Sequence, residues 1–343
     1  MRLGLGLGYW SGSSTLDMDL VLEAERLGFD SLWAAEAWGS DAVTVLSWVA
    51  ARTRRVTVGS SILQMAARTP AMTAMTAVTL NELSGGRFVL GLGVSGPQVV
   101  EGWHGRPYGK PLGVTREYVE IVRSAVARER PLSHRGPHYQ IPFGGEGSTG
   151  LGKPLTLTTR PTHEFPIYLA AIGPRNVALA AEIADGWLPV FFSPERAAAV
   201  FGESLAAGFA AAGDRERASR FDVVASVQVV IDDDLEAARM RVKPTLAFYI
   251  GAMGARGRNF YNDLACRYGY EEAAATIQDE YLTGHRVAAT RAVPDALVDE
   301  VALVGTREMI RDRLDAWRAS PATTLMISGG DRATLRTLAE LLG

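Results

Sequence analysis

Short apolar runs alternate along the chain with amphipathic segments, and this alternation predicts parallel strands covered by helices. Several of the runs are apolar at every position, as expected of strands that are buried on both faces. Eight strands are predicted, at Leu3–Trp10, Phe29–Glu36, Val56–Leu63, Arg87–Val94, Pro166–Ile172, Trp187–Phe192, Asp222–Ile231 and Thr324–Ser328.

Helix signals fall between these strands. Leu16, Leu20 and Ala24 share one helical face, and Gly28 ends that segment just before the next strand. Eight strand and helix pairs over this length predict an α/β fold, a (β/α)8 TIM barrel that spans residues 1–343 as a single domain.

The chain is longer than a minimal barrel, and the extra residues predict two insertions. They follow the fourth and seventh strands, at about 97–165 and 241–299. The first holds the glycine-rich stretch Gly136–Gly152, which predicts a loop near the active face. The second carries helical patterns around Tyr249 and Glu271.

Composition excludes several classes of function. Hydrophobic residues make up 47% of the chain and charged residues 21%, which is typical of a folded domain. A net charge of −3 without a basic stripe argues against nucleic acid, and no apolar run is long enough for a membrane helix. The single cysteine, Cys266, favours the cytoplasm, and the scattered histidines predict no metal site.

The stretch Gly91–Gly96 matches the pattern GxGxxG after a predicted strand. A dinucleotide-binding turn would run straight into a helix, but here Pro97 follows and later glycines interrupt any helix. Two interpretations remain open. Either the glycines let a flat ring lie against the strand end, or they are needed for tight packing inside the barrel.

The fifth predicted strand leads into Gly173-Pro174-Arg175-Asn176 and then a helix. The free N–H groups and the positive dipole end of such a helix start suit a phosphate. A plain N-terminal cap is the alternative.

The second strand ends in an acid, Glu36, followed closely by Trp38. At the rim of a barrel, a carboxylate shielded by an indole would be able to hold and pass a proton. In the alternative interpretation, the carboxylate only accepts hydrogen bonds from neighbouring backbone groups.

Several longer stretches resemble the bacterial-luciferase-like oxidoreductases, and within them the subgroup that uses the deazaflavin coenzyme F420. The resemblance covers the first six strands in order and implies a TIM barrel with the cofactor across its C-terminal face. The matching stretches are Arg68–Ala71, Thr79–Phe88, Leu90–Gly93, Glu25–Trp33 and Ala184–Trp187.

The resemblance also implies site residues. The deazaflavin ring is expected against the ends of strands two to four, with a cis peptide at Ser61-Ile62, and the phosphate at the helix start after strand five. Residues expected to bind the cofactor are Glu36, Ser60, Ser61, Ile62, Gly93, Val94, Ser95, Ala171, Ile172, Gly173, Pro174 and Arg175; Tyr9, Trp38 and His104 are expected to line the substrate pocket.

The chain departs from the sugar-phosphate dehydrogenases of this family. Those enzymes carry a histidine after the strand-two acid and a glutamate after strand four, where this chain has Ala37 and Gly96. Their substrate lysine is also absent from the apolar stretch 189–192. A sugar phosphate is therefore not the expected substrate.

The sequence favours a coenzyme F420-dependent oxidoreductase that moves a hydride between C5 of the deazaflavin and a small organic substrate, with reduction of a C=C or C=N bond as one form of the reaction. Glu36 is the candidate catalytic proton donor or orienting group. An FMN-dependent luciferase-like monooxygenase and a cofactor-free binding barrel are the alternatives. Expected partners are a small-molecule or peptide substrate and a second copy in a homodimer.

Overall fold

The computed structural model describes residues 1–8 and 15–343. Within them, eight parallel strands form a closed barrel, in which β1 pairs with β2 and β12, and β9 pairs with β10 to close the ring. The TIM barrel predicted from the sequence is therefore confirmed; β10 and β12 have the predicted bounds, whereas β2, β3, β5, β8 and β9 are shorter than predicted. The barrel strands are β1 (Arg2–Gly8), β2 (Ser31–Ala34), β3 (Thr57–Ser60), β5 (Phe88–Gly93), β8 (Ile167–Ala170), β9 (Gly186–Leu188), β10 (Asp222–Ile231) and β12 (Thr324–Ser328).

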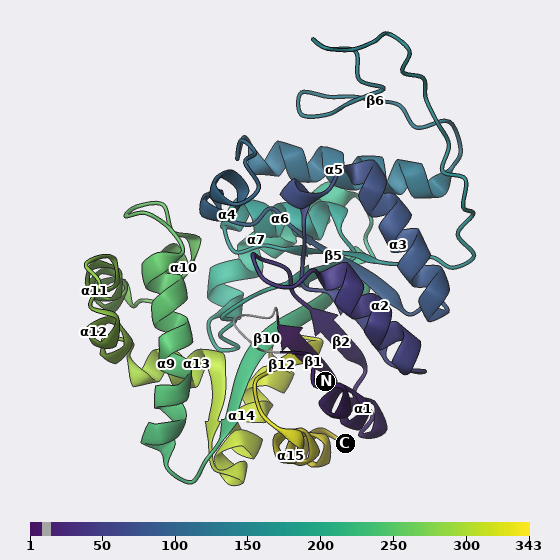
Figure 1. Ribbon diagram of the computed structural model, residues 1–343. Coiled ribbons are helices and arrows are strands. Elements are labelled where there is room, and N and C mark those ends of the chain that lie inside the picture. Colours follow the sequence, from purple (N-terminus) through teal and green to yellow (C-terminus); the bar gives the residue numbers. More distant parts are fainter. Residues whose placement is uncertain (9–14) are drawn as a thin grey trace.

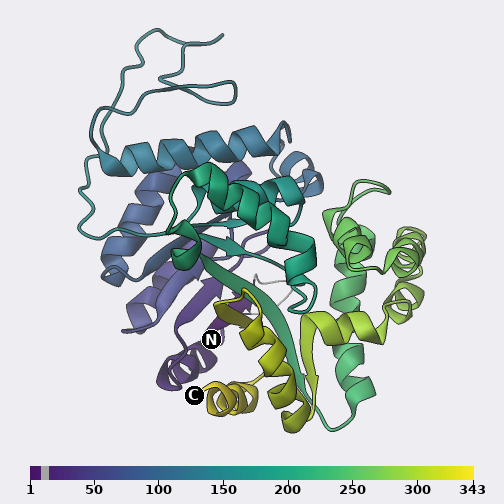
Figure 2. The same cartoon turned by 180° about the vertical axis from the view of Figure 1, so that it is seen from behind.

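Helices surround the barrel (Figure 1). The two C-terminal helices, shown in yellow, pack beside β10 and β11 (Ala302–Gly305), as the view from behind shows (Figure 2). Many begin at caps that the sequence supplies: the side chains of Asp17, Asp41 and Thr69 each accept a hydrogen bond from a backbone N–H of the helix that follows. The helices of this layer are α1 (Met18–Arg26), α2 (Ala42–Arg52), α3 (Pro70–Ser84), α5 (Pro111–Ala127), α6 (Pro174–Ile183), α7 (Ala197–Ala212), α8 (Arg217–Arg220), α14 (Arg307–Ala319) and α15 (Arg332–Leu342).

Trp33 of β2 fills much of the barrel interior. Its indole is buried, stacks on the ring of Tyr168 with centroids 6.0 Å apart, and donates from Nε1 to Ser31 Oγ at 2.8 Å. A Cβ atom on Gly59 would lie 2.4 Å from the Trp33 ring. Glycine at this position is therefore what makes room for the indole inside the barrel.

The segment between β5 and β8 holds α4 (Pro97–Gly102), α5 and a hairpin of β6 (His134–Arg135) and β7 (Gln140–Ile141), which projects beyond α5 (Figure 1). The sequence predicted that Gly136–Gly152 lies near the active face, and this was wrong: none of these residues lines the cavity at the C-terminal ends of the strands. The reason lies in Glu117 of α5. Its buried carboxylate accepts hydrogen bonds from the backbone of His138 and Tyr139 and holds the hairpin on the outer side of the helix.

Five helices and a further strand, β11 (Ala302–Gly305), separate β10 from α14. The helical signals around Tyr249 and Glu271 are confirmed by two of these helices. The sequence missed β11, which pairs with the end of β10 beyond the point where β9 stops. The predicted strand 187–192 was too long, because Pro189 offers no N–H to a ladder. The helices are α9 (Leu235–Ala252), α10 (Phe260–Arg267), α11 (Glu271–Leu282), α12 (Arg286–Arg291) and α13 (Asp295–Val301).

Candidate active site

A cavity of about 400 Å³ opens at the C-terminal ends of the barrel strands. Its wall combines these strand ends with residues of α9 and α10, so the second insertion completes it. The sequence-predicted residues that line it are Glu36, Trp38, Ser61, Ile62, Gly93, Val94, Ser95, Ala171, Ile172 and Gly173.

Four other predicted residues do not line this cavity. Ser60 is fully buried, and its hydroxyl bonds the backbone of Gly91 at 2.8 Å and 2.9 Å, a role in joining β3 to β5. Pro174 and Arg175 are exposed in the first turn of α6. His104 lies behind the wall. Tyr9 falls outside the described residues.

A cavity of about 550 Å³ lies at the opposite end of the barrel. There, Asp222 accepts hydrogen bonds from the Tyr168 hydroxyl and the Arg2 guanidinium, so the polar groups satisfy one another. The active sites of TIM barrels lie at the C-terminal face, so we interpret the polar network at the N-terminal end as structural support for the barrel. The C-terminal cavity is therefore the candidate active site.

One wall of the candidate active site is backbone without bulky side chains. The peptide Ser61-Ile62 is cis, as the resemblance implied, and it precedes β4 (Leu63–Gln64) and a 3-10 turn, η1 (Met65–Ala67). A Cβ on Gly93 would lie 2.9 Å from Ile62 Cγ1, and one on Gly91 would lie 1.8 Å from the carbonyl oxygen of Ser60. Both contacts support the interpretation that the glycines are needed for tight packing. Gly93 also borders the cavity, and contact of a flat ring with this strand end stays a prediction.

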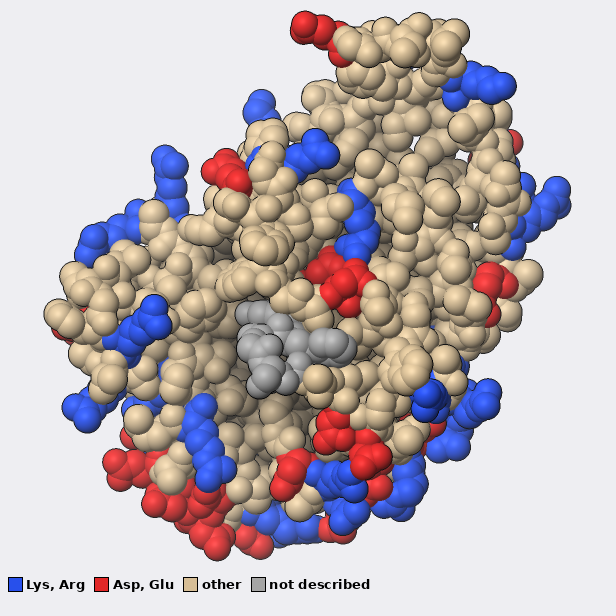
Figure 3. All heavy atoms as spheres, in the orientation of Figure 1, with Lys and Arg blue, Asp and Glu red and all other residues tan. Residues whose placement is uncertain are grey.

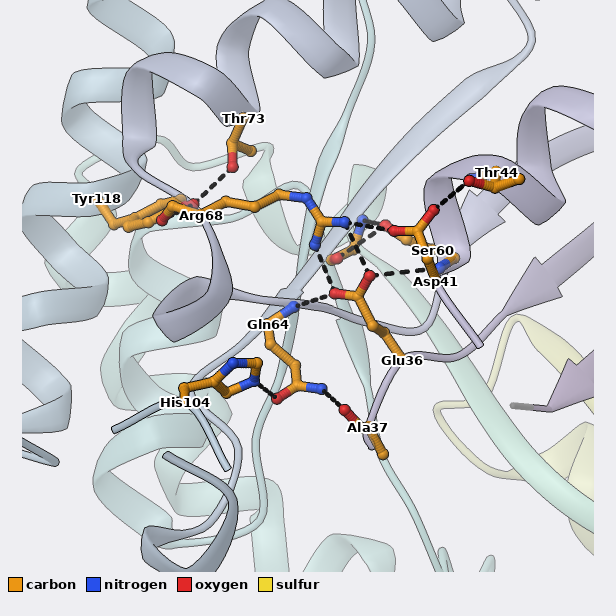
Figure 4. A network of polar contacts seen from close by, with 12 residues as sticks. Glu36, Ala37, Asp41, Thr44, Ser60, Gln64, Arg68, Thr73, His104 and Tyr118 are labelled. Atoms are coloured by element: carbon orange, nitrogen blue, oxygen red, sulfur yellow. Dashed lines mark hydrogen bonds and ion pairs between the residues drawn. The ribbon is translucent and has the colours of Figure 1, made fainter. Parts of the chain in front are cut away.

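Glu36 is held by a dense polar network (Figure 4). Its two carboxylate oxygens accept hydrogen bonds from Arg68 Nη1 at 2.6 Å and Nη2 at 2.9 Å, and from the backbone N–H groups of Ala42 and Gln64. Arg68 also pairs with Asp41 at 2.7 Å. Burial lowers the pKa of Arg68, but its hydrogen bond and charge interactions with Glu36 and the charge of Asp41 outweigh burial and raise that pKa. This geometry fixes the Glu36 carboxylate in one position.

A second layer supports the same wall. Gln64 Nε2 donates to the carbonyl oxygen of Ala37 at 2.6 Å, so Gln64 Oε1 faces His104 Nε2 at 2.9 Å as an acceptor. This pattern assigns the proton to Nε2 of His104. His104 therefore positions Gln64 instead of lining the pocket as predicted.

The start of α6 borders the cavity through Gly173 and Asn176. Gly173 is the N-cap, no side chain caps the helix, and a Cβ at Gly173 would meet no atom within 4 Å. From α10, Arg267 Nη2 donates to the carbonyl oxygen of Ile172 at 2.8 Å and braces this turn from behind. The sequence predicted the helix start, but nothing near Arg267 in the chain indicated this contact.

The sequence also missed an aromatic wall made by Phe191, Tyr249 and Tyr261. Phe191 follows β9, and the two tyrosines belong to α9 and α10. The apolar stretch 189–192 and the helical pattern around Tyr249 were visible in the sequence, but their meeting in one cavity was not.

The described residues contain neither a candidate metal-binding cluster nor a helix that could cross a membrane. No group of three or more His, Cys, Asp or Glu side chains there is placed to hold a metal ion. No helix in that part of the chain has the length and apolar character needed to cross a membrane.

Comparison with known proteins shows similarity over the whole barrel. Residues 16–324 match the family model described as luciferase-like monooxygenase. A Mycobacterium tuberculosis protein assigned as a coenzyme F420-dependent oxidoreductase is 48% identical over 344 residues, covering 100% of this chain and 99% of that protein. The 5,10-methylenetetrahydromethanopterin reductase of Archaeoglobus fulgidus is 30% identical, covering 85% and 82%.

Among solved structures, the coenzyme F420-dependent tetrahydromethanopterin reductase of Methanopyrus kandleri superimposes with a TM-score of 0.78. The match covers 99% of this chain and 97% of that one, at 21% identity. This similarity supports the barrel fold.

Proposed function

Because the chain belongs to the luciferase-like monooxygenase family and its cavity joins the wall at Ser61-Ile62 and Gly93 to an uncapped helix start, we propose that it is a coenzyme F420-dependent oxidoreductase. Its F420-dependent relatives support the choice of cofactor. When bound, the deazaflavin supplies a ring carbon, C5, that donates or accepts a hydride. The observation that carries the proposal is that Ile62, Gly93 and Gly173 border one cavity.

The residues present fit such a cofactor. The Ser61-Ile62 peptide and Gly93 leave a wall against which a flat ring can lie. Gly173 and Asn176 border the cavity at the start of α6, where free N–H groups and the helix dipole favour a phosphate. This wall and the helix start border the same cavity, so one bound cofactor molecule would contact both.

Glu36 acts in this proposal as an orienting group. Arg68 and two backbone N–H groups hold its carboxylate in one place at the cavity wall. A carboxylate that accepts this many hydrogen bonds is fixed in position, which suits an orienting role. The substrate of the hydride transfer is a small organic molecule, and a C=C or C=N bond remains its proposed reactive group.

Titration with separate cofactors tests the proposal. Quenching of intrinsic fluorescence should show F420 binding at least about tenfold more tightly than FMN, with NADPH as a control nucleotide. FMN binding as tight as F420 would support the monooxygenase alternative. Binding of none of the three would support a cofactor-free barrel.

The proposal extends to assembly and location. Trp48 of α2 and Met72, Met75 and Leu83 of α3 are large apolar side chains exposed on two adjoining helices. An exposed patch of this kind is typical of a protein interface. We place the contact of a homodimer there, and we keep the cytoplasm as the proposed location.

A further inference from the structure

We propose that the aromatic wall of the cavity is a substrate subsite and that it takes an uncharged, flat, apolar compound. The aromatic wall is defined as Phe191, Tyr249 and Tyr261. This inference rests on the proposed function, because it assigns the other wall of the same cavity to the cofactor.

The three rings form a closed cluster. The centroids of Phe191 and Tyr249 are 5.3 Å apart, those of Tyr249 and Tyr261 are 4.8 Å apart, and those of Phe191 and Tyr261 are 6.0 Å apart. Every pair meets edge to face, at 67° to 75°. This arrangement holds each ring in place, so the wall is already formed for a flat guest that packs against aromatic faces and edges.

The wall also carries backbone strain. Phe191 has a φ of 49°, in the left-handed region that bulky residues rarely adopt. The Tyr268 hydroxyl holds the turn by donating to the carbonyl oxygen of Phe191 at 2.9 Å. Strained non-glycine residues concentrate at functional sites, and this one is aimed at the cavity.

The charged side chains around the cavity indicate which class of substrate it binds. Among the described residues that line the cavity, Glu36 is the one charged side chain, and Arg68 already neutralises it. An anionic substrate at the aromatic wall would lose its hydration without gaining a cation, so this part of the cavity favours uncharged compounds.

The neutral lining still offers hydrogen bonds. Ser226, Gln228 and Thr245 border the cavity and carry hydroxyl or amide groups. Such groups can bind a carbonyl or imine of the substrate without requiring a charge. Tyr249 and Tyr261 belong to α9 and α10, and Ser226 and Gln228 belong to β10. On the face seen in Figure 3, a group of acidic and basic side chains lies near the centre and others lie along the lower edge.

Two ligands with the same ring system test the charge requirement. By calorimetry on protein loaded with F420, 2-acetylnaphthalene should bind at least about tenfold more tightly than the 2-naphthoate anion. Equal affinity, or preference for the anion, would overturn the proposal. This comparison needs no variant and so does not depend on one that folds.

Tyr249→Leu and Tyr261→Leu test the wall itself. Each should raise the Kd of 2-acetylnaphthalene about fivefold or more and change that of F420 by less than about twofold. The matched control is Tyr281→Leu on α11, whose ring does not line the cavity and which should leave both constants unchanged. Unchanged ketone binding in both folded wall variants would show that the subsite lies elsewhere.

The same experiment separates the two proposals. If the ketone binds cofactor-free protein and is lost in Tyr249→Leu while F420 does not bind at all, the subsite stands and the proposed cofactor is wrong. If F420 binds and the ketone does not, the cofactor stands and the subsite falls.

Discussion

The contacts of Glu36 illustrate how a single residue's surroundings decide its chemistry. In the sequence it is an acid at a strand end beside Trp38, which suggested a proton donor. In the structure Trp38 is 42% exposed, and the carboxylate is enclosed by Arg68 and backbone donors instead. These donors fix the carboxylate in one position at the cavity wall.

We predict that Glu36→Gln weakens F420 binding about tenfold or more, because the amide cannot hold Arg68 and the cavity wall in the same position. Fluorescence titration measures the effect. Glu182→Gln is a matched control, since Glu182 forms a similar two-point pair with Arg116 outside the cavity. Normal F420 affinity combined with a turnover about a hundredfold lower would instead make Glu36 the proton donor.

At the start of α6, Gly173→Asp should weaken F420 binding by about tenfold or more, because it places a carboxylate beside the proposed phosphate. A Cβ atom at position 173 would meet no other atom within 4 Å, so the variant should still fold. Gly202→Asp is the control: it lies in α7, also has open space around its Cβ, and does not line the cavity. An unchanged Kd in folded Gly173→Asp would place the phosphate elsewhere.

At the scale of elements, β2 and β3 depend on the fit between an indole and a glycine. Gly59→Ala should destabilise the protein by ~1–3 kcal/mol, because its methyl group would collide with the Trp33 ring in a filled barrel. Thermal and denaturant unfolding measure the loss. Gly202→Ala, in open space on α7, should be neutral or slightly stabilising. Equal stability of Gly59→Ala and the unmodified chain would mean that Trp33 moves freely.

The hairpin on α5 depends on a titratable anchor. Burial raises the pKa of Glu117, but hydrogen bonds from His134, Tyr139 and His138 outweigh this and hold the pKa below its ordinary value of 4.5. The stabilisation is therefore present above the unfolded-state pKa and is lost as the pH falls through the lower folded-state value.

We accordingly predict that Glu117→Gln lowers the Tm at pH 7 by about 2 °C or more, and that the difference shrinks below about pH 4. Glu120→Gln, an exposed change on the same helix, should leave the Tm unchanged. A Glu117→Gln deficit that stays constant at acid pH would mean that its charge does not hold the hairpin.

At the scale of the whole molecule, the exposed apolar face of α2 and α3 predicts self-association. Light scattering should give about twice the chain mass of 36.8 kDa, and Met75→Glu should shift the protein toward the monomer, because it buries a charge in the contact. Val287→Glu, an exposed change on α12, should not alter the mass. A monomer for the unmodified chain at micromolar concentration would refute the interface.

Structural features that depend on residues close together in the sequence could be predicted, whereas features that depend on residues far apart in the sequence could not. The barrel strands and most helices follow from runs, caps and glycines that lie next to one another in the chain. Strand β11 and the end of β9 were not predicted correctly, because a four-residue apolar run or a proline is compatible with more than one secondary structure. The hairpin at β6 and β7 was misplaced, since its position depends on Glu117, which lies outside the glycine-rich stretch.

The sequence by itself determined the barrel class, the glycine-lined strand end, the helix start at Gly173 and the family resemblance, because each depends on residue types at fixed local spacing. Only the tertiary structure decided which groups meet at the cavity. Arg68 reaches Glu36 from the far side of β3, and Tyr249 and Tyr261 reach Phe191 from an insertion. Pairings of this kind depend on how the closed sheet and its insertion pack, and no pattern of neighbouring residues encodes them.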